Sequence, residues 1–158
     1  MSDRSERSSS IPWPPIIYVA AAAIAIILAV FYPMAWLPSP LAELAFATGV
    51  VIIAGAVFIE FKAMQALKQG DTTVLPTKRS DHLVTDGPYS FTRNPIYLGN
   101  TMLMIGAGFV FGVFWFFLAA IIAAFVTTKL AIEPEEKHLE HRFGKAFRDY
   151  RKKVRRWV

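Results

Sequence analysis

Residues 95–128 read PIYLGNTMLMIGAGFVFGVFWFFLAAIIAAFVTT and contain no charged side chain. Two further stretches, 15–32 (PIIYVAAAAIAIILAVFY) and 44–59 (LAFATGVVIIAGAVFI), are also free of charge. A helix needs about 20 apolar residues to cross a bilayer, and it satisfies its own backbone amides where lipid offers no partner. These stretches therefore predict transmembrane helices.

The longest stretch has room for two helices. Its glycines mark the expected joint, near Gly106, Gly108 and Gly112, although one long bent helix is the alternative. With 54% hydrophobic and 18% charged residues, the chain is too apolar for an ordinary soluble domain. We therefore predict an all-α, polytopic membrane protein with four spans, at about 15–32, 41–62, 95–111 and 113–132.

Basic side chains set the expected orientation. The 17 Lys and Arg residues lie in the N-terminal tail, between 62 and 93, or from Lys129 onward. Under the positive-inside rule all three parts face the cytoplasm, with both termini, and we expect a bacterial inner membrane. The net charge of +5 fits anionic membrane lipids. We expect no nucleic-acid partner, because no RNA-binding motif accompanies the charges.

The two ends of the chain differ in character. Residues 1–11 are polar and serine-rich, which predicts a disordered tail. The apolar run behind them is longer than a cleaved signal sequence has, so residues 12–158 are expected to form a single membrane-embedded domain. After span four, apolar residues recur at steps of three and four among basic ones, which predicts one amphipathic helix in the cytoplasmic interface: Leu139, Phe143, Phe147, Tyr150, Val154 and Trp157.

Polar residues stand directly before the third span, in the segment 87–99 (GPYSFTRNPIYLG). Asn is a favoured helix N-cap and Pro is favoured at the first helical position, so Asn94 and Pro95 predict where this span begins. The free amides at a helix N-terminus attract anions, and Arg93 lies just before them. A carboxylate would therefore be held well at this place.

A second polar cluster follows span four. Glu133, Glu135 and Glu136 stand there, and Pro134 either kinks the helix or begins the next one. Because both clusters are expected on the cytoplasmic side, Arg93 and the acidic pair could face one pocket.

Two packing details are expected near the cytoplasmic ends of spans two and three. Glu60 lies near Lys62 and Lys68, which is typical of a solvated helix end. Gly99 leaves room for a neighbouring helix or a ligand to approach closely.

The histidines and the absence of cysteine bear on metal binding. His138 and His141 are three residues apart on the expected helix, one turn after Glu135. Nothing else completes a zinc or iron pattern, and a chain without cysteine has no thiolate ligands. We therefore predict no metal site.

Two motifs in this region resemble those of a known group of enzymes. The chain is similar to the isoprenylcysteine carboxyl methyltransferases and phospholipid methyltransferases, which are integral-membrane enzymes that use S-adenosylmethionine. The first motif matches at Leu83, Val84, Gly87, Pro88, Tyr89, Arg93, Asn94, Pro95, Tyr97 and Gly99. The second matches at Glu135, Glu136, Leu139, Phe143, Gly144, Phe147, Tyr150, Val154 and Arg155.

The resemblance implies a cofactor site for S-adenosylmethionine at the cytoplasmic interface, within residues 70–158. The cofactor contacts that it implies are His82, Leu83, Val84, Tyr89, Asn94, Pro95, Tyr97 and Glu135. Arg93 and Glu136 are the implied catalytic residues.

The implied reaction moves a methyl group to a lipophilic or lipidated acceptor, for which a carboxylate such as that of isoprenylcysteine is the leading choice. The alternatives are a phospholipid (ethanolamine) N-methyltransferase, a sterol-reductase-like enzyme that uses NADPH, and a noncatalytic membrane scaffold. Two departures leave the acceptor open: Asn94 stands where many members have histidine, and Lys129 to Ala131 lacks an arginine found in the prenylcysteine branch. The sequence leaves the oligomeric state open.

Overall fold

The computed structural model describes residues 13–70 and 83–158. The predicted tail 1–11 and the predicted cofactor contact His82 lie outside these residues. Within them, the helices are α1 (Trp13–Phe31), α2 (Leu41–Gln69), α3 (Pro95–Phe111), α4 (Trp115–Thr127), α5 (Glu133–Phe143) and α6 (Lys145–Lys153). A 3₁₀ turn, Gly87–Ser90, precedes α3, and a π-helical turn, Thr128–Ile132, joins α4 to α5.

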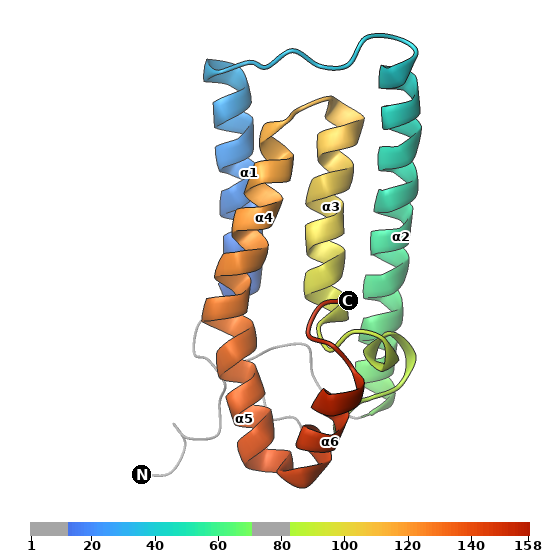
Figure 1. Cartoon of the computed structure of the whole chain (residues 1–158), viewed down its shortest axis with the longest axis vertical. Helices are drawn as coiled ribbons and strands as arrows, with labels where there is room; N and C mark the ends of the chain where they lie inside the picture. The colour runs from blue at the N-terminus through green and yellow to red at the C-terminus, as the bar shows by residue number, and fades with distance from the viewer. Residues whose placement is uncertain (1–12, 71–82) are drawn as a thin grey trace.

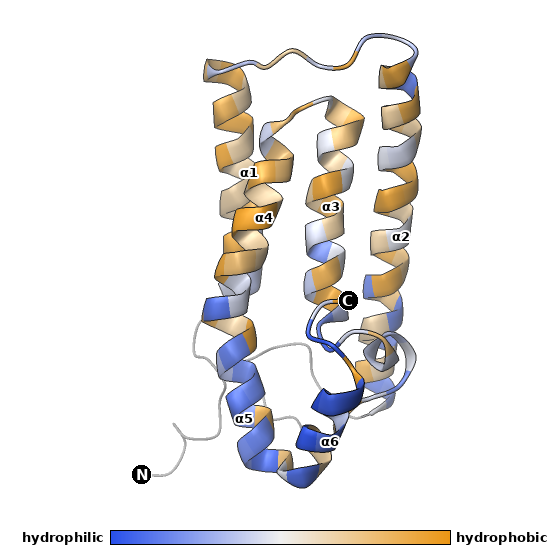
Figure 2. Cartoon of the chain, in the orientation of Figure 1, coloured by the Kyte–Doolittle hydropathy of each residue, from blue (hydrophilic) through white to orange (hydrophobic). Residues whose placement is uncertain are grey.

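The four long helices run alternately up and down (Figure 1). α4 packs on α1 and α3, and α2 packs on the other side of α3. The N-terminal ends of α1 and α3 therefore meet the C-terminal ends of α2 and α4 at one end of the body. α5 continues beyond this end, and Figure 2 shows that hydrophilic residues gather there while apolar residues cover the rest of the long helices. We call it the polar end.

The predicted joint between spans three and four lies at Gly112, where α3 ends. Gly112 has φ +65°, and its N–H donates to the Gly108 carbonyl. A Cβ at Gly112 would lie 2.9 Å from the Trp36 ring, so both the backbone and the packing require glycine. Two antiparallel helices, rather than one bent helix, occupy 95–127.

The other two glycines of that stretch lie inside α3. Gly106 faces Gly49 of α2, and a Cβ on Gly49 would come within 2.8 Å of the Gly106 carbonyl oxygen. Gly108 faces Phe117 of α4. Small residues let helix backbones approach closely, which is the usual basis of helix association in lipid. Gly106 and Gly108 therefore serve packing rather than the turn.

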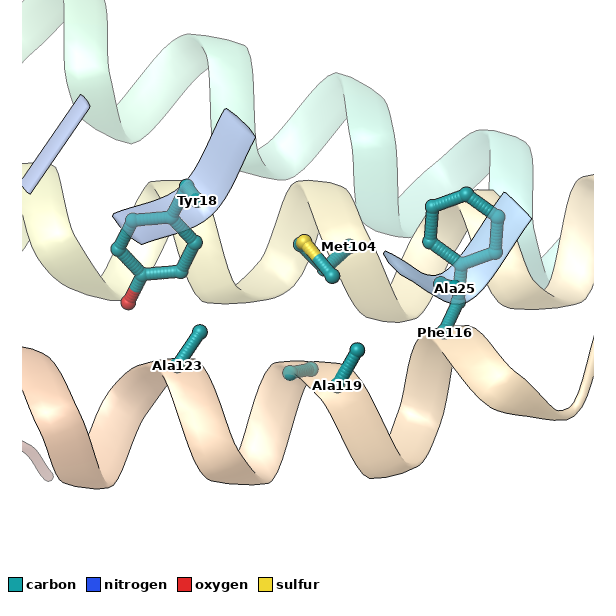
Figure 3. Packing of buried hydrophobic residues seen from close by; sticks show 7 residues of the cluster. Tyr18, Ala25, Met104, Phe116, Ala119 and Ala123 are labelled. Carbon is teal, nitrogen blue, oxygen red and sulfur yellow. The ribbon is translucent and has the colours of Figure 1, made fainter. Parts of the chain in front are cut away.

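Alanines line the contact of α1 with α4. Figure 3 shows Ala119 and Ala123 facing Tyr18 of α1 and Met104 of α3. The Tyr18 hydroxyl would be costly in this apolar contact without a partner. It lies 2.6 Å from Thr101 Oγ1 and donates to the Tyr97 carbonyl at 3.2 Å, so α1 is bonded to α3 close to the polar end.

Three helices, Trp13–Phe31, Leu41–Gln69 and Trp115–Phe143, are long and apolar enough to cross a membrane. α3 is also apolar but has 17 residues, which corresponds to about 26 Å of helix. Large hydrophobic side chains stay exposed along these helices, as lipid-facing surfaces require, for example Val19, Val51 and Ile121. The prediction of four apolar helices is confirmed.

The predicted single amphipathic helix after span four is wrong in two respects. Gly144, with φ +51°, divides it into α5 and α6, and Val154 is already extended. Its apolar side is covered by protein rather than lipid, since Phe147, Tyr150 and Val154 pack together with three partly buried residues, Leu83, Leu139 and Phe143. A period of 3.6 residues does not reveal where one positive φ will end a helix.

Glu60 is not the solvated helix end that was predicted. Its Oε1 is buried and has no hydrogen-bond partner within residues 13–70 and 83–158. The side chain lies over Gly99 of α3, where an added Cβ would come within 2.6 Å of that oxygen. The expected close approach at Gly99 is therefore made by the neighbouring helix α2.

Candidate active site

The two polar clusters of the sequence meet at the polar end. Tyr97, in the first turn of α3, donates its hydroxyl to Glu135 Oε2 at 3.1 Å. Arg93, just before α3, lies with Nη2 2.9 Å from Glu136 Oε1. Both glutamates belong to the first turn of α5, which the π-helical turn connects directly to α4. Arg93 and the acidic pair thus come together as expected, while a pocket shared by them stays a prediction.

Glu136 is held between two arginines. Arg93 contacts one of its oxygens, and Arg156 binds both, from Nε to Oε1 at 3.1 Å and from Nη2 to Oε2 at 2.7 Å. Glu136 is 8% exposed, and the Arg93 side chain 9%. A buried carboxylate needs such partners, and the two-pronged contact with Arg156 is the strong form of this pairing. The catalytic role predicted for Glu136 stays a prediction, and these contacts are those of a group that positions Arg93.

Arg93 uses only part of its hydrogen-bonding capacity. Its Nε and Nη1 are buried and lack partners among the described residues. Burial lowers the pKa of Arg93, and the charge of Glu136 opposes this shift. Buried donors left unpaired are costly, and the guanidinium fork matches a carboxylate or phosphate. The two open donors would suit such an anion.

Two tyrosines, Tyr97 and Tyr89, lie near the other glutamate of the pair, and Tyr150 holds the backbone of Tyr89. Tyr97 donates to Glu135, and the nearby carboxylate of Glu135 adds to the burial that raises the pKa of Tyr89. Tyr150 donates its hydroxyl to the Tyr89 carbonyl at 2.6 Å, and burial raises the pKa of Tyr150 to about 12, with Arg93 opposing. The phenols of Tyr89 and Tyr150 therefore stay neutral, and the rings of Tyr89 and Tyr97 with the carboxylate of Glu135 form a good environment for a cation.

The turn before α3 places Tyr89 in this group. Gly87 has φ +58°, and Pro88 is buried in the 3₁₀ turn Gly87–Ser90. Leu83 and Val84, which precede the turn, line a different hollow with the C-terminal part of α2, of about 540 Å³. The described lining of this hollow does not include Arg93 or Glu135. The predicted cofactor contacts thus fall into two places.

Asn94 occupies the N-cap position of α3, as predicted, but its side chain does not cap the helix. Pro95 is the first residue of α3, as expected, but the Asn94 side chain makes no capping hydrogen bond. Its Nδ2 donates to the Arg156 carbonyl at 2.8 Å. The predicted use of this amide for cofactor binding is therefore in competition with a contact inside the protein.

Arg156 is the main participant that sequence reasoning missed. The motif was matched as far as Arg155, the residue before it, whose carbonyl accepts from the Arg93 N–H at 3.0 Å. The hydrogen bond to Glu136 raises the pKa of Arg156. The family motif has its last arginine two residues after the valine at 154, which is Arg156 rather than Arg155, so the motif itself was the signal that could have found it. His138 and His141 belong to no group of three potential metal ligands in the described part of the chain.

Comparisons with known proteins identify the family of the chain. The family model described as phospholipid methyltransferase matches residues 44–146, more than half of the 158 residues. The protein-S-isoprenylcysteine O-methyltransferase of Schizosaccharomyces pombe is 32% identical over 99 residues, which cover 61% of this chain and 42% of that protein. The chain thus spans less than half the length of this relative. Together with its apolar helices, the match identifies an integral membrane protein, and the chain belongs to the phospholipid methyltransferase family.

Proposed function

We propose that the chain is an S-adenosylmethionine-dependent methyltransferase that methylates a carboxylate on a lipophilic acceptor, such as an isoprenylcysteine-like molecule. Membership of the family and the name of the yeast relative support methyl transfer. The apolar helices that end at the polar end support an acceptor that reaches the site from the bilayer.

The observation that carries the choice of a carboxylate is the state of Arg93. Its Nε and Nη1 are buried and lack partners in the described residues, while Glu136 already neutralises Nη2. An acceptor carboxylate would satisfy these two donors and be held in one orientation. A carboxylate also needs no base before it is methylated, whereas an ethanolamine nitrogen must first lose a proton.

The residues present fit the proposed cofactor. S-adenosylmethionine, when bound, supplies a methyl group activated by its positively charged sulfur. Tyr89, Tyr97 and Glu135 offer neutral aromatic rings and a carboxylate, which suit a cation or ribose hydroxyls. The N-terminal end of α3 suits the methionyl carboxylate. These groups would bind and orient, which is where most of the catalytic effect of alignment lies.

We further propose that the polar end faces the cytoplasm of a bacterial inner membrane. Five Lys and Arg residues lie between 62 and 93, the segment after α4 is rich in them, and the turns at the opposite end carry none.

The test is binding followed by turnover in detergent. The purified protein should bind S-adenosylmethionine and not NADPH, and it should transfer labelled methyl from the cofactor to a prenylcysteine analogue. The label should be released by alkali, as from a methyl ester. Label in phosphatidylethanolamine that resists alkali would favour N-methylation instead.

Variants identify the site. Arg93→Ala should abolish transfer, and Arg148→Ala, which removes an exposed arginine 3.9 Å from Glu140, is the matched control. Binding of neither cofactor, with correct folding, would favour the scaffold and refute the proposal.

A further inference from the structure

The chain returns to the candidate site after α6. Figure 1 shows it passing from α6 back to the start of α3. We call residues 154–158 the return segment. It forms a parallel bridge in which Thr92 pairs with Arg155. The Arg93 N–H donates to the Arg155 carbonyl, and Thr92 Oγ1 donates to the Arg156 carbonyl at 3.3 Å.

The return segment is fixed at both ends. Val154 is buried against Phe147 and Tyr150. Trp157 donates its indole N–H to Thr128 Oγ1 at 3.3 Å, in the π-helical turn. Between these anchors, Arg156 is held with its carbonyl toward the loop before α3 and its guanidinium toward α5.

The guanidinium of Arg156 controls how Glu136 meets Arg93. Because Arg156 takes both oxygens of Glu136, one of them reaches Arg93 only at Nη2. Without Arg156, the carboxylate would be free to turn and pair with two nitrogens of Arg93, the geometry that this pair prefers. The nitrogens proposed to receive the acceptor would then be occupied.

We infer that Arg156 is a positioning residue of the site: it restrains Glu136 so that Arg93 keeps two donors open for an anion, and its carbonyl holds Asn94 at the start of α3. The inference rests on the proposed function for what the anion is. The placement of the return segment is independent of that function and is tested separately.

The kinetic test compares the KM for the acceptor with the Kd for the cofactor. Arg156→Gln should raise the KM for the prenylcysteine analogue about tenfold, the scale of one charge-assisted hydrogen bond, and leave the Kd of S-adenosylmethionine within twofold. Arg156→Lys should have a KM between those of the wild type and Arg156→Gln, because an ammonium restrains two carboxylate oxygens less well than a guanidinium does. Adding Glu136→Gln to Arg156→Gln should lower the KM again, since the obstructing carboxylate is gone. A KM that is unchanged in Arg156→Gln, or worse in the double variant, would overturn the inference.

Unfolding supplies a readout that needs no activity. Arg93→Gln should lower the unfolding midpoint more in the Arg156→Gln background than in the wild type, because Glu136 then depends on Arg93 alone. Arg151→Gln, which removes an exposed arginine 3.4 Å from Glu140, is the matched background. In it, Arg93→Gln should lower the unfolding midpoint as much as in the wild type. Equal shifts in all three backgrounds would refute the placement of Arg156.

The natural absence of cysteine allows a direct check of the return segment. Thr92→Cys with Arg155→Cys should form a disulfide on mild oxidation, whereas Thr92→Cys with Lys145→Cys should not. If the wild type neither binds the cofactor nor methylates, the proposed function fails, and this disulfide and the unfolding shifts still decide where the return segment lies.

Discussion

Replacing Gly99 by alanine should destabilise the chain, although alanine is the better helix former. In an exposed helix the change would add about 1 kcal/mol of stability. Here the new methyl would lie 2.6 Å from Glu60 Oε1 and 2.9 Å from its Cδ. The Glu60 side chain must therefore move as a whole, and such overpacking costs about 1–3 kcal/mol.

Gly55→Ala is the matched control on the same helix pair. The nearest atom to its new methyl is Met102 Cε at 3.6 Å, an ordinary contact, so the gain in helix propensity remains. The stabilities of Gly99→Ala and Gly55→Ala should therefore differ by about 1–3 kcal/mol. Reversible unfolding in mixed micelles measures both.

A Glu60→Ala background tests whether the Glu60 side chain causes the penalty. If Glu60 causes the penalty, Gly99→Ala should cost nothing in a Glu60→Ala background, where no carboxylate lies over the helix. Equal stabilities for Gly99→Ala and Gly55→Ala would contradict this prediction. So would a penalty that persists without Glu60, because either result would show that the Glu60 side chain does not lie against Gly99.

Three further predictions concern the candidate site. Glu136→Gln should lower stability by about 3 kcal/mol, because it leaves the buried Arg93 unneutralised, whereas Glu140→Gln, at an exposed pair, should cost less than about 1 kcal/mol by the same unfolding assay. Tyr97→Phe should weaken S-adenosylmethionine binding about tenfold by calorimetry, because the hydrogen bond that orients Glu135 is lost. Deleting Leu130 from the π-helical turn should abolish cofactor binding and leave the helical circular dichroism unchanged.

The sequence predicts the four apolar helices well, because the features that determine where they begin and end are local. Length and apolarity identify a span, and Gly112 ends α3 because one residue alone supplies the positive φ. Gly144 is not predictable in this way, because the apolar period continues through this glycine although it ends α5. A glycine within a periodic pattern is ambiguous until tertiary contacts decide whether its backbone stays helical.

Only some residues of the site can be predicted from the sequence. Arg93, Tyr97 and Glu135 lie next to helix ends that the sequence reveals, so their convergence follows from the antiparallel order of the helices. The place of Arg156 depends on Glu136, twenty residues earlier in the chain. The place of Glu60 depends on the space that Gly99 of α3 leaves open. No local pattern distinguishes Glu60 from its neighbours, and the motif that includes Arg156 does not reveal that its partner is Glu136.

The π-helical turn explains how one helix serves both the apolar body and the site. Buried positions of α4 recur at Ala120, Ala123 and Thr127, and at 3.6 residues per turn this face would continue near residues 131 and 134. In the turn, the Glu133 N–H donates to the Thr128 carbonyl five residues earlier, so one extra residue enters the helix. The inward face then falls on Glu135 and Glu136, about 100° from where an uninterrupted helix would place them. One inserted residue thus directs both carboxylates toward α3 without disturbing the packing of α4.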